Sequence, residues 1–226
     1  MNKDNVSVII RVKNEERWIG HAIQSTLDNL NGPQIVVVDN KSTDESIDIV
    51  RSFRHDPALE KNEKRYADVV ITSINDYTPG KALNQGVANC TFDNILILSA
   101  HCVISKLINL EKLYQLVQRY GCVFGKQVPA YRGRKITPRY LWSHFGDERK
   151  INMSSQLENR FFLHNAFCFY SKQALIDFPF DENISGKEDR IWASVYANAG
   201  NSYLYDPELV AYHHYTDKGN TWKGVG

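Results

Sequence analysis

The chain has 226 residues, a formal net charge of +1 and a hydrophobic content of 42%. A chain of this length can bury a substantial core, so one large domain is expected. The near-neutral charge argues against nucleic-acid binding, which needs a clearly basic surface. The four cysteines form neither a C-x-x-C pair nor a regular framework, which indicates reduced thiols in a cytoplasmic protein.

Hydropathy predicts no membrane-spanning segment. No apolar run approaches the roughly 20 residues needed to cross a bilayer. The polar residues 1–5 lead directly into an apolar run, which is not the pattern of a signal peptide. We therefore expect a soluble protein, with peripheral association at the inner face of a membrane left open.

Strands and helices alternate in the first half of the chain. Apolar, β-branched runs predict strands at 6–10, 35–39, 68–72 and 95–98. Apolar residues at helical spacing predict helices at 18–30, from Ser42 or Thr43 to 53, and from about 81 onward, while the charged stretch 55–67 predicts a loop or a short polar helix. This order is typical of parallel strands joined by right-handed crossovers. Neither a G-x-G-x-x-G loop nor a phosphate-binding P-loop is present.

Two predicted strands end in polar residues. The strand at 95–98 ends in Ser99, Ala100 and His101, and the strand at 35–39 ends in Asp39. In open α/β sheets ligands bind at the carboxyl ends of the strands, so a site is expected there. Lys81 near a helix start opposes the helix dipole, which suggests an anionic ligand or an acidic neighbour, although a solvated lysine fits equally well.

The second half is less regular. Helices are predicted at 107–120, at 172–177 and from 185 or 186 to 199, and strands at 122–129, 161–170, 202–206 and 210–215. The strand at 161–170 is interrupted by His164 and Asn165, which must be satisfied or face a cavity. The basic, aromatic stretch 130–158 is either a substrate-facing loop or a solvated insertion. The tail 216–226 is either a flap over the site or a frayed end.

Several of these motifs resemble family 2 glycosyltransferases. The resemblance rests on residues 7–10, residues 13–16, the Val-Val-Val-Asp-Asn-Lys-Ser-Thr-Asp run at 36–44, and residues 80–86. The resemblance implies a GT-A fold, which is a single α/β domain with a mostly parallel central sheet flanked by helices. Residues 1–104 would form the nucleotide-sugar-binding half. Residues 105–226 would form the acceptor-binding half and a C-terminal flap.

The resemblance also implies a nucleotide site at the strand ends. Its candidate residues are Arg11, Lys13, Glu15, Asp39, Lys81 and Ser99. Carboxylates can accept hydrogen bonds from a base or ribose, while cations suit phosphate. The competing interpretation is that Asp39 caps the next turn and that the charges of Arg11 and Glu15 pair at the surface.

The family's metal-binding Asp-x-Asp is replaced here by Ser99-Ala100-His101. This Ser-Ala-His is similar to a subgroup that resembles rhamnosyl and capsule-type transferases. Either His101 ligates a divalent cation, Mn²⁺ or Mg²⁺, or the site is metal-free and His101 contacts phosphate directly; simple packing is the third interpretation. His213 or His214 could be a second ligand, and alternation along a strand allows only one of them to face the site.

The Glu188-Asp189 pair matches the family's Glu-Asp motif. The resemblance implies that Asp189 is the general base of an inverting reaction and that Glu188 orients the acceptor, although first-turn carboxylates also simply suit a helix dipole. Candidate sugar or acceptor contacts are His164, Asn165 and Trp192.

The expected function is transfer of a sugar from a nucleotide-sugar donor to a hydroxyl of a polysaccharide or a lipid-linked glycan at the cell surface. One alternative is a non-catalytic nucleotide-sugar-binding subunit. Another is a sugar-1-phosphate nucleotidyltransferase, which is disfavoured because residues 11–17 contain no glycine-rich loop. Homo-oligomerisation is left open.

Overall fold

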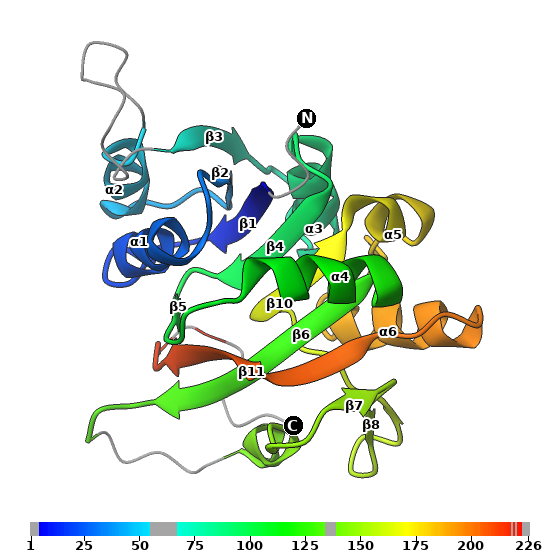
Figure 1. The fold of residues 1–226 in the computed structure, drawn as a ribbon. Coiled ribbons are helices and arrows are strands. Elements are labelled where there is room, and N and C mark those ends of the chain that lie inside the picture. Colours follow the sequence, from blue (N-terminus) through cyan, green and yellow to red (C-terminus); the bar gives the residue numbers. More distant parts are fainter. Residues whose placement is uncertain (1–4, 55–66, 134–138, 218, 220, 223–226) are drawn as a thin grey trace.

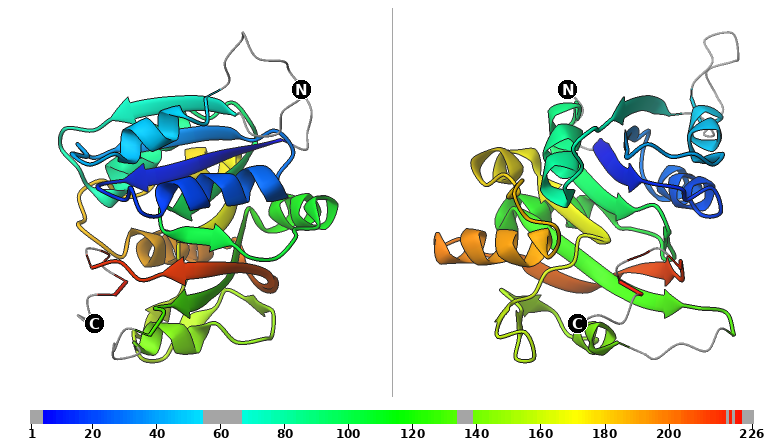
Figure 2. Two further views of the ribbon diagram at one scale, coloured as in Figure 1. Left: turned by 90° about the vertical axis from the view of Figure 1, so that its left-hand side faces the viewer. Right: turned by 180° about the vertical axis from the view of Figure 1, so that it is seen from behind.

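One twisted β-sheet runs through the molecule, and helices cover both of its faces (Figures 1 and 2). The computed structural model describes residues 5–54, 67–133, 139–217, 219, 221 and 222. The expectation for 55–67 therefore lies almost entirely outside the described residues, as do parts of the tail. No helix within the described ranges has both the length and the apolar character that a membrane crossing requires.

The first half is a parallel α/β unit. Its elements are β1 (Val6–Val12), α1 (Ile19–Asn29), β2 (Gln34–Asp39), α2 (Ser46–Arg51), β3 (Asp68–Ser73), α3 (Pro79–Ala88) and β4 (Asn94–Ser99). The strand order is β3-β2-β1-β4, and all three pairings are parallel. β1, β2 and β4 are almost wholly buried, which explains their continuous apolar runs. The predicted β-α-β-α order is confirmed.

The second half extends the same sheet in mixed orientation. Its elements are β5 (Cys102–Ile104), α4 (Leu110–Tyr120), β6 (Cys122–Ala130), the 3₁₀ helix η1 (Tyr140–His144), β7 (Lys150–Ile151), β8 (Ser154–Ser155), β9 (Arg160–Phe161), β10 (Phe167–Ser171), α5 (Lys172–Asp177), α6 (Glu188–Asn198) and β11 (Leu204–His214). β10 is antiparallel to both β4 and β6 and so joins the two halves. β11 runs parallel to β6 and antiparallel to β5 and β7, while β8 and β9 form a separate two-stranded ribbon.

Two predictions about the second half were wrong in detail. The strand expected at 161–170 is divided between β9 and β10, because His164 and Asn165 bond to side chains instead of to a neighbouring strand. The strands expected at 202–206 and 210–215 are one strand, β11, with a bulge. Asp206 pairs with Gly125 and Val210 pairs with the next residue of β6, Lys126, so residues 207–209 are extra.

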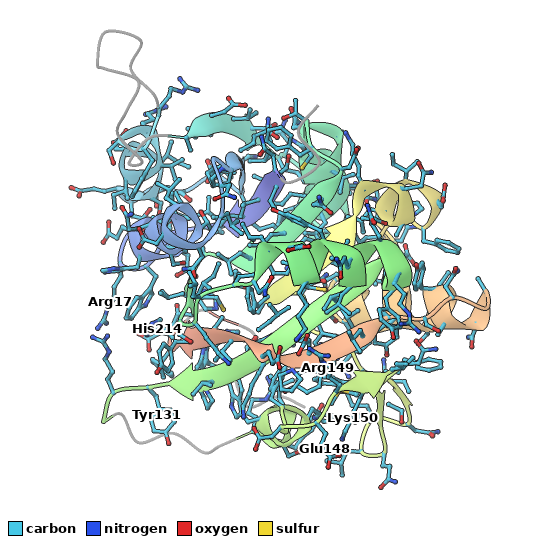
Figure 3. All side chains as sticks on the ribbon, viewed as in Figure 1. Arg17, Tyr131, Glu148, Arg149, Lys150 and His214 are labelled. Atoms are coloured by element: carbon cyan, nitrogen blue, oxygen red, sulfur yellow. The ribbon has the colours of Figure 1, made fainter. Side chains whose placement is uncertain are left out.

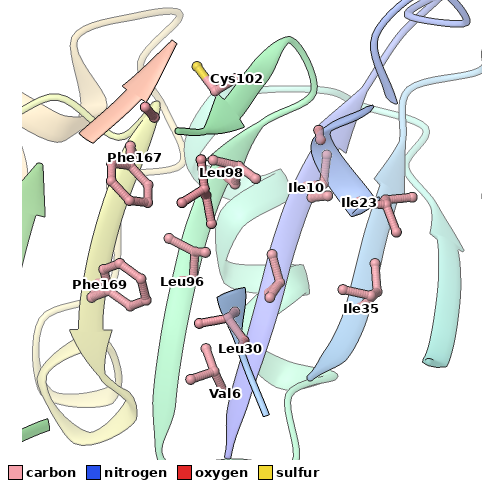
Figure 4. Packing of buried hydrophobic residues seen from close by; sticks show 14 of the residues in the cluster. Val6, Ile10, Ile23, Leu30, Ile35, Leu96, Leu98, Cys102, Phe167 and Phe169 are labelled. Carbon is pink, nitrogen blue, oxygen red and sulfur yellow. The ribbon is translucent and has the colours of Figure 1, made fainter. Parts of the chain in front are cut away.

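Each face of the sheet carries its own apolar core. Helices α1, α2 and α4 pack on one face, and α3, α5 and α6 pack on the other. In the first core, side chains of Ile10, Leu98 and Phe167 come from three adjacent strands (Figure 4). Helix α4 ends at Gly121, whose φ of +67° is left-handed and whose added Cβ would lie 2.0 Å from the Tyr196 hydroxyl. Glycine is therefore required on both counts.

Candidate active site

Two adjoining cavities lie at the carboxyl ends of β1 and β4. The first has a volume of about 530 Å³, and its lining includes Arg11, Lys13, Glu15, Asn40, Ser99 and His101. The second has a volume of about 270 Å³, and its lining includes Glu158, His164, Asn165, Glu188, Asp189 and Arg190. Arg11, Tyr77, Ser99 and Thr221 line both. The structure thus brings most of the predicted site residues together in one continuous site.

The charged loop after β1 is held by the loop after β2. The Asn14 N–H donates to Ser42 Oγ at 3.0 Å, and the Glu15 N–H donates to Ser46 Oγ at 2.7 Å. Ser42 therefore supports this loop, and α2 begins only at Ser46 instead of at the predicted Ser42 or Thr43. Asp39 Oδ1 accepts the Ser42 N–H at 2.9 Å, so Asp39 caps the turn as the competing interpretation expected. It is Asn40 that lines the first cavity.

Two histidines face each other beside the first cavity. His101 Nε2 lies 3.1 Å from His213 Nε2, and His101 Nδ1 lies 3.1 Å from Glu15 Oε1. On the far side of His213, Nδ1 lies 2.9 Å from Gln127 Oε1. His213 is completely buried, and burial together with the neighbouring His101 lowers its pKa well below the ordinary value. His213 is therefore the histidine that faces the site.

His214 points to the opposite face of β11. Its ring stacks on Trp18 with centroids 4.0 Å apart, and the Arg17 and Arg132 guanidinium groups lie 5.1 and 5.7 Å from the Trp18 ring. Figure 3 shows His214 and Arg17 near the same end of the molecule. Burial, reinforced by Arg132, lowers the pKa of His214 to about 4. The His214 backbone N–H donates to the His101 carbonyl at 2.9 Å, but its side chain points away from the His101 ring, so this geometry does not fit the predicted role of His214 as a metal ligand.

The acidic pair begins helix α6. Lys187, with a left-handed φ of 62°, precedes the helix, and both carboxylates lie in its first turn. Glu188 Oε1 accepts from Arg11 Nη1 at 3.0 Å, which ties the first half of the chain to the second. Both acids are buried and line the second cavity.

Asp189 is saturated with hydrogen bonds. Oδ1 accepts from the Arg190 backbone N–H at 2.8 Å and from Arg190 Nη1 at 2.9 Å. Oδ2 accepts from the Asn165 N–H at 3.1 Å and from the same Nη1 at 3.0 Å. Burial alone would raise the pKa of Asp189, but the Arg190 charge and these hydrogen bonds outweigh it and hold that pKa below its ordinary value.

His164 and Asn165 line the second cavity just before β10. His164 Nδ1 accepts from Gln127 Nε2 at 2.9 Å, and burial followed by the Arg190 charge lowers the pKa of His164 to about 3. The Asn165 side-chain oxygen accepts from the Tyr170 hydroxyl, but its buried Nδ2 has no hydrogen-bond partner among the described residues. A buried amide donor that lines a cavity is suited to a hydroxyl ligand.

A family model identifies the family of this chain. The model of glycosyl transferase family 2 matches residues 7–179, which is well over half of the chain. The protein belongs to glycosyltransferase family 2. A search of curated protein sequences found no match.

Solved structures of glycosyltransferases share the fold. Residues 1–349 of TarS from S. aureus, in complex with UDP-GlcNAc, match with a TM-score of 0.71 and 18% identity over 98% of this chain and 62% of that one. The mannosyltransferase PcManGT from Pyrobaculum calidifontis, in complex with GDP-Man and Mn²⁺, matches with a TM-score of 0.64 and 17% identity over 95% and 58%. GalNAc-T7 with UDP, GalNAc and Mn²⁺ matches at 0.67 and 14% over 100% and 46%. These likenesses confirm the predicted GT-A fold, and the chain spans less than two thirds of each of these proteins.

Two family-based predictions do not fit the geometry. Trp192 is 2% exposed, donates from Nε1 to the Phe178 carbonyl at 2.6 Å and stacks on Tyr196, so it belongs to the apolar core and not to a sugar site. Lys81 lines a different cavity together with Pro179, so it does not join the other predicted nucleotide contacts. Helical periodicity places both residues correctly on helices but does not give the direction of either side chain.

The side chains available here to hold the family's divalent cation differ from the usual Asp-x-Asp carboxylates. Within the described ranges, no three side chains of His, Cys, Asp or Glu gather as a metal centre would require. The two Nε2 atoms of His101 and His213 do converge, and each ring has an oxygen acceptor behind its Nδ1. Metal-binding histidines are commonly held this way, so the pair fits a cation that completes its coordination with substrate oxygens.

Several site residues were missed by sequence reasoning. They are Tyr77, Gln127, Arg139, Glu158, Arg190 and Thr221. Gln127 carried a usable signal, because it is a polar residue inside the strand at 122–129. Arg139 and Thr221 lie in the two stretches with alternative interpretations, and the structure joins them: Arg139 Nη1 donates to the Thr221 carbonyl at 2.9 Å.

The described part of the tail folds back over the site. Trp222 Nε1 donates to the His214 carbonyl at 2.9 Å, and its ring lies 5.1 Å from that of Trp142 and 5.8 Å from that of His213. Thr221 consequently lines both cavities. These contacts favour the flap interpretation for 221 and 222, while 218, 220 and 223–226 lie outside the described residues.

Proposed function

We propose that the protein is an inverting glycosyltransferase that moves a sugar from a nucleotide-sugar donor to a hydroxyl of a polysaccharide or a lipid-linked glycan of the cell surface. The main observation in support is the pair of adjoining cavities. The first is lined by the cations Arg11 and Lys13, which suit a diphosphate, and the second contains the carboxylates Glu188 and Asp189. Similar folds bound to UDP-GlcNAc, GDP-Man and UDP support a nucleotide-sugar donor. A lipid-linked acceptor would place the protein at the inner face of a membrane.

Charge stabilisation of the departing diphosphate has two sources in this proposal. The first is the protein itself, through Arg11 and Lys13 and through the histidine pair when a proton lies between its two Nε2 atoms. The second is a divalent cation held by His101 and His213, which when bound would neutralise charge on the leaving group. Imidazole nitrogens suit Mn²⁺ better than the hard ion Mg²⁺. Mn²⁺ in the complexes of PcManGT and GalNAc-T7 supports this cation.

Asp189 is our candidate for the general base. It can accept a proton only after Arg190 releases one of its oxygens, because all four hydrogen-bonding positions are taken. A second partner for Arg190 is at hand: its Nε lies 3.4 Å from Glu158 Oε2, and neither atom has a hydrogen-bond partner among the described residues. We therefore infer that acceptor binding moves Arg190 toward Glu158 and frees Asp189.

Glu188 is the second candidate for the base. Its Oε1 is engaged by Arg11, whereas no hydrogen bond to a described residue involves its Oε2. A carboxylate oxygen with an open position in the second cavity can remove a proton from an acceptor hydroxyl without prior rearrangement. In this arrangement Asp189 would be the residue that orders the Asn165 loop.

The deciding experiment measures nucleotide release from UDP-, GDP-, dTDP- and CMP-sugars, with a panel of glycan acceptors and with Mn²⁺, Mg²⁺ or EDTA. We expect release from one donor class, accelerated by acceptor and by Mn²⁺. Nucleotide binding without release for every donor would favour the non-catalytic binding subunit. Formation of a nucleotide-sugar from a nucleoside triphosphate and a sugar phosphate would establish the nucleotidyltransferase alternative instead.

A further inference from the structure

Gln127 contacts His164, which lines the second cavity, and His213, whose ring faces His101 of the first cavity. It is on β6, the residue is 2% exposed, and nothing in the family motifs points to it. Its Oε1 lies 2.9 Å from Nδ1 of His213, and its Nε2 lies 2.9 Å from Nδ1 of His164. One buried amide thus joins the histidine pair of the first cavity to the polar loop of the second.

The direction of this amide is fixed by its surroundings. His164 Nδ1 also accepts the Ala166 backbone N–H at 3.4 Å, so this nitrogen carries a lone pair. The His164 carbonyl oxygen lies 3.5 Å from Gln127 Nε2 and is a second acceptor on the same side. Two acceptors require the NH₂ group to face His164. Gln127 Oε1 must then face His213, whose Nδ1 carries the hydrogen.

These hydrogen positions determine what each histidine offers to its cavity. With its hydrogen on Nδ1, neutral His213 presents a bare Nε2 lone pair toward His101, 3.1 Å away. His101 donates from Nδ1 to the Glu15 carboxylate, so its Nε2 also directs a lone pair at His213 unless a cation, either a proton or a metal ion, lies between them. His164, with a lone pair on Nδ1, carries its hydrogen on Nε2 and offers a donor.

We propose that Gln127 is a positioning residue that sets two tautomers at once: His213 with a bare Nε2 for the cation beside the donor diphosphate, and His164 with an Nε2–H donor for a sugar hydroxyl. The use of each histidine rests on the proposed function, whereas the tautomers themselves rest only on the hydrogen-bond geometry. An amide is suited to this task because it accepts at one end and donates at the other. A carboxylate of the same size could serve His213 but not His164.

The first test needs no variant. Long-range ¹H–¹⁵N spectra of the wild-type protein, histidine-labelled and without added metal, should show hydrogen on Nδ1 of His213 and on Nε2 of His164. The opposite tautomer at either residue would overturn the proposal. Because no substrate is involved, this result is independent of whether the protein transfers sugars.

Two substitutions then test the two ends of the Gln127 amide separately. Gln127→Glu should keep Mn²⁺ affinity in the presence of UDP within about threefold of wild type, but move the His164 hydrogen to Nδ1 and lower kcat at least about tenfold. Gln127→Met should release both histidines and weaken Mn²⁺ binding, measured by calorimetry, by about 10–100-fold. The matched control is Gln34→Met, since Gln34 is also 2% exposed but bonds to Ser7 at the amino end of the sheet.

The outcomes are distinguishable. Unchanged tautomers and Mn²⁺ affinity in Gln127→Met would make Gln127 a packing residue and overturn the proposal. If Gln127→Met does not fold, the test uses Gln127→Glu alone. Wild-type tautomers of both His213 and His164 in that protein would overturn the proposal. If the tautomers respond as expected but no donor is turned over by wild type, the proposed function fails while the role of Gln127 stands.

Discussion

His101 and His213 meet through their Nε2 atoms, 3.1 Å apart, although one follows β4 and the other lies on β11, the last strand in chain order. Glu15 and Gln127 stand behind the two rings and keep both Nε2 atoms directed inward. In the proposed cation site, two imidazole nitrogens would take the place of the family's usual carboxylate ligand. This replacement should change which ion the site prefers, and it leads to the first prediction.

His101→Asp should shift the cation preference of the reaction from Mn²⁺ toward Mg²⁺, because a carboxylate oxygen suits the harder ion. His101→Ala should lower kcat/KM with Mn²⁺ at least about tenfold, since it removes one of the two nitrogens. Both are checked by metal titrations of donor turnover. His214→Phe is the matched control, because His214 faces Trp18 and not the site. Full activity and unchanged metal dependence in His101→Ala would mean that His101 only packs.

The two carboxylates of α6 can be assigned by substitution. If Asp189 is the base, Asp189→Asn should lower kcat by about 10²–10⁴-fold with little change in KM for the donor, whereas Glu188→Gln should act mainly on the acceptor KM. Rate measurements at saturating donor give this comparison. The reverse pattern, with kcat lost in Glu188→Gln and retained in Asp189→Asn, would transfer the role of base to Glu188.

Asp189 should also matter for stability, apart from its chemistry. It pairs with buried Arg190, and removing one partner of such a pair costs about 3–5 kcal/mol. Urea unfolding of Asp189→Asn should show this loss. The double substitution Asp189→Asn with Arg190→Met should recover part of it, because Arg190 would otherwise keep only its 3.4 Å contact with Glu158. Purely additive losses would indicate that the ion pair contributes nothing.

Stability should fall as the pH is lowered below neutrality. The folded-state pKa of His164 is about 3 and that of His214 is about 4, whereas an unfolded histidine titrates near pH 6.5. Between these values the unfolded chain binds more protons than the folded one, so the free energy of unfolding rises with pH in this window.

Urea unfolding between pH 5 and pH 7 measures this slope, in a range where most carboxylates stay ionised. His214→Phe keeps an aromatic ring on Trp18 but removes one titrating group. The slope of its unfolding free energy against pH should be smaller than that of wild type, and the difference should correspond to the uptake of up to about one proton on unfolding. An identical slope in the variant would contradict the low pKa of His214.

The contacts of Trp222 in the tail lead to a prediction about donor binding. Trp222→Ala removes the contact with Trp142 and the hydrogen bond to the His214 carbonyl, so Thr221 should no longer be held between the cavities. We expect the KM for the donor to rise by about tenfold, equivalent to about 1.4 kcal/mol. Trp222→Phe, which keeps the ring, should lie closer to wild type. Donor kinetics unaffected by Trp222→Ala would mean that the tail rests on the site without contributing to binding.

The order of strands and helices and the position of the strand-end site could be predicted from the sequence, because buried strands and amphipathic helices have periodic apolar patterns. The sequence could not give the direction of single side chains. Trp192 and Lys81 lie on predicted helices but face elsewhere, and Asp39 caps a turn that leaves its neighbour Asn40 at the cavity. The pairing of Arg190 with Asp189 and the role of Gln127 depend on contacts between distant segments, which no local pattern records.

The bulge in β11 shifts the register between the end of this strand and β6. Three extra residues, 207–209, separate the two stretches that pair with β6. After the bulge Ala211 pairs with Gln127, and because side chains alternate between the two faces of a strand, this register places His213 on the same face as Gln127 while His214 turns away. A one-residue shift of the pairing after the bulge would exchange the faces of the two histidines and leave His101 opposite the wrong one.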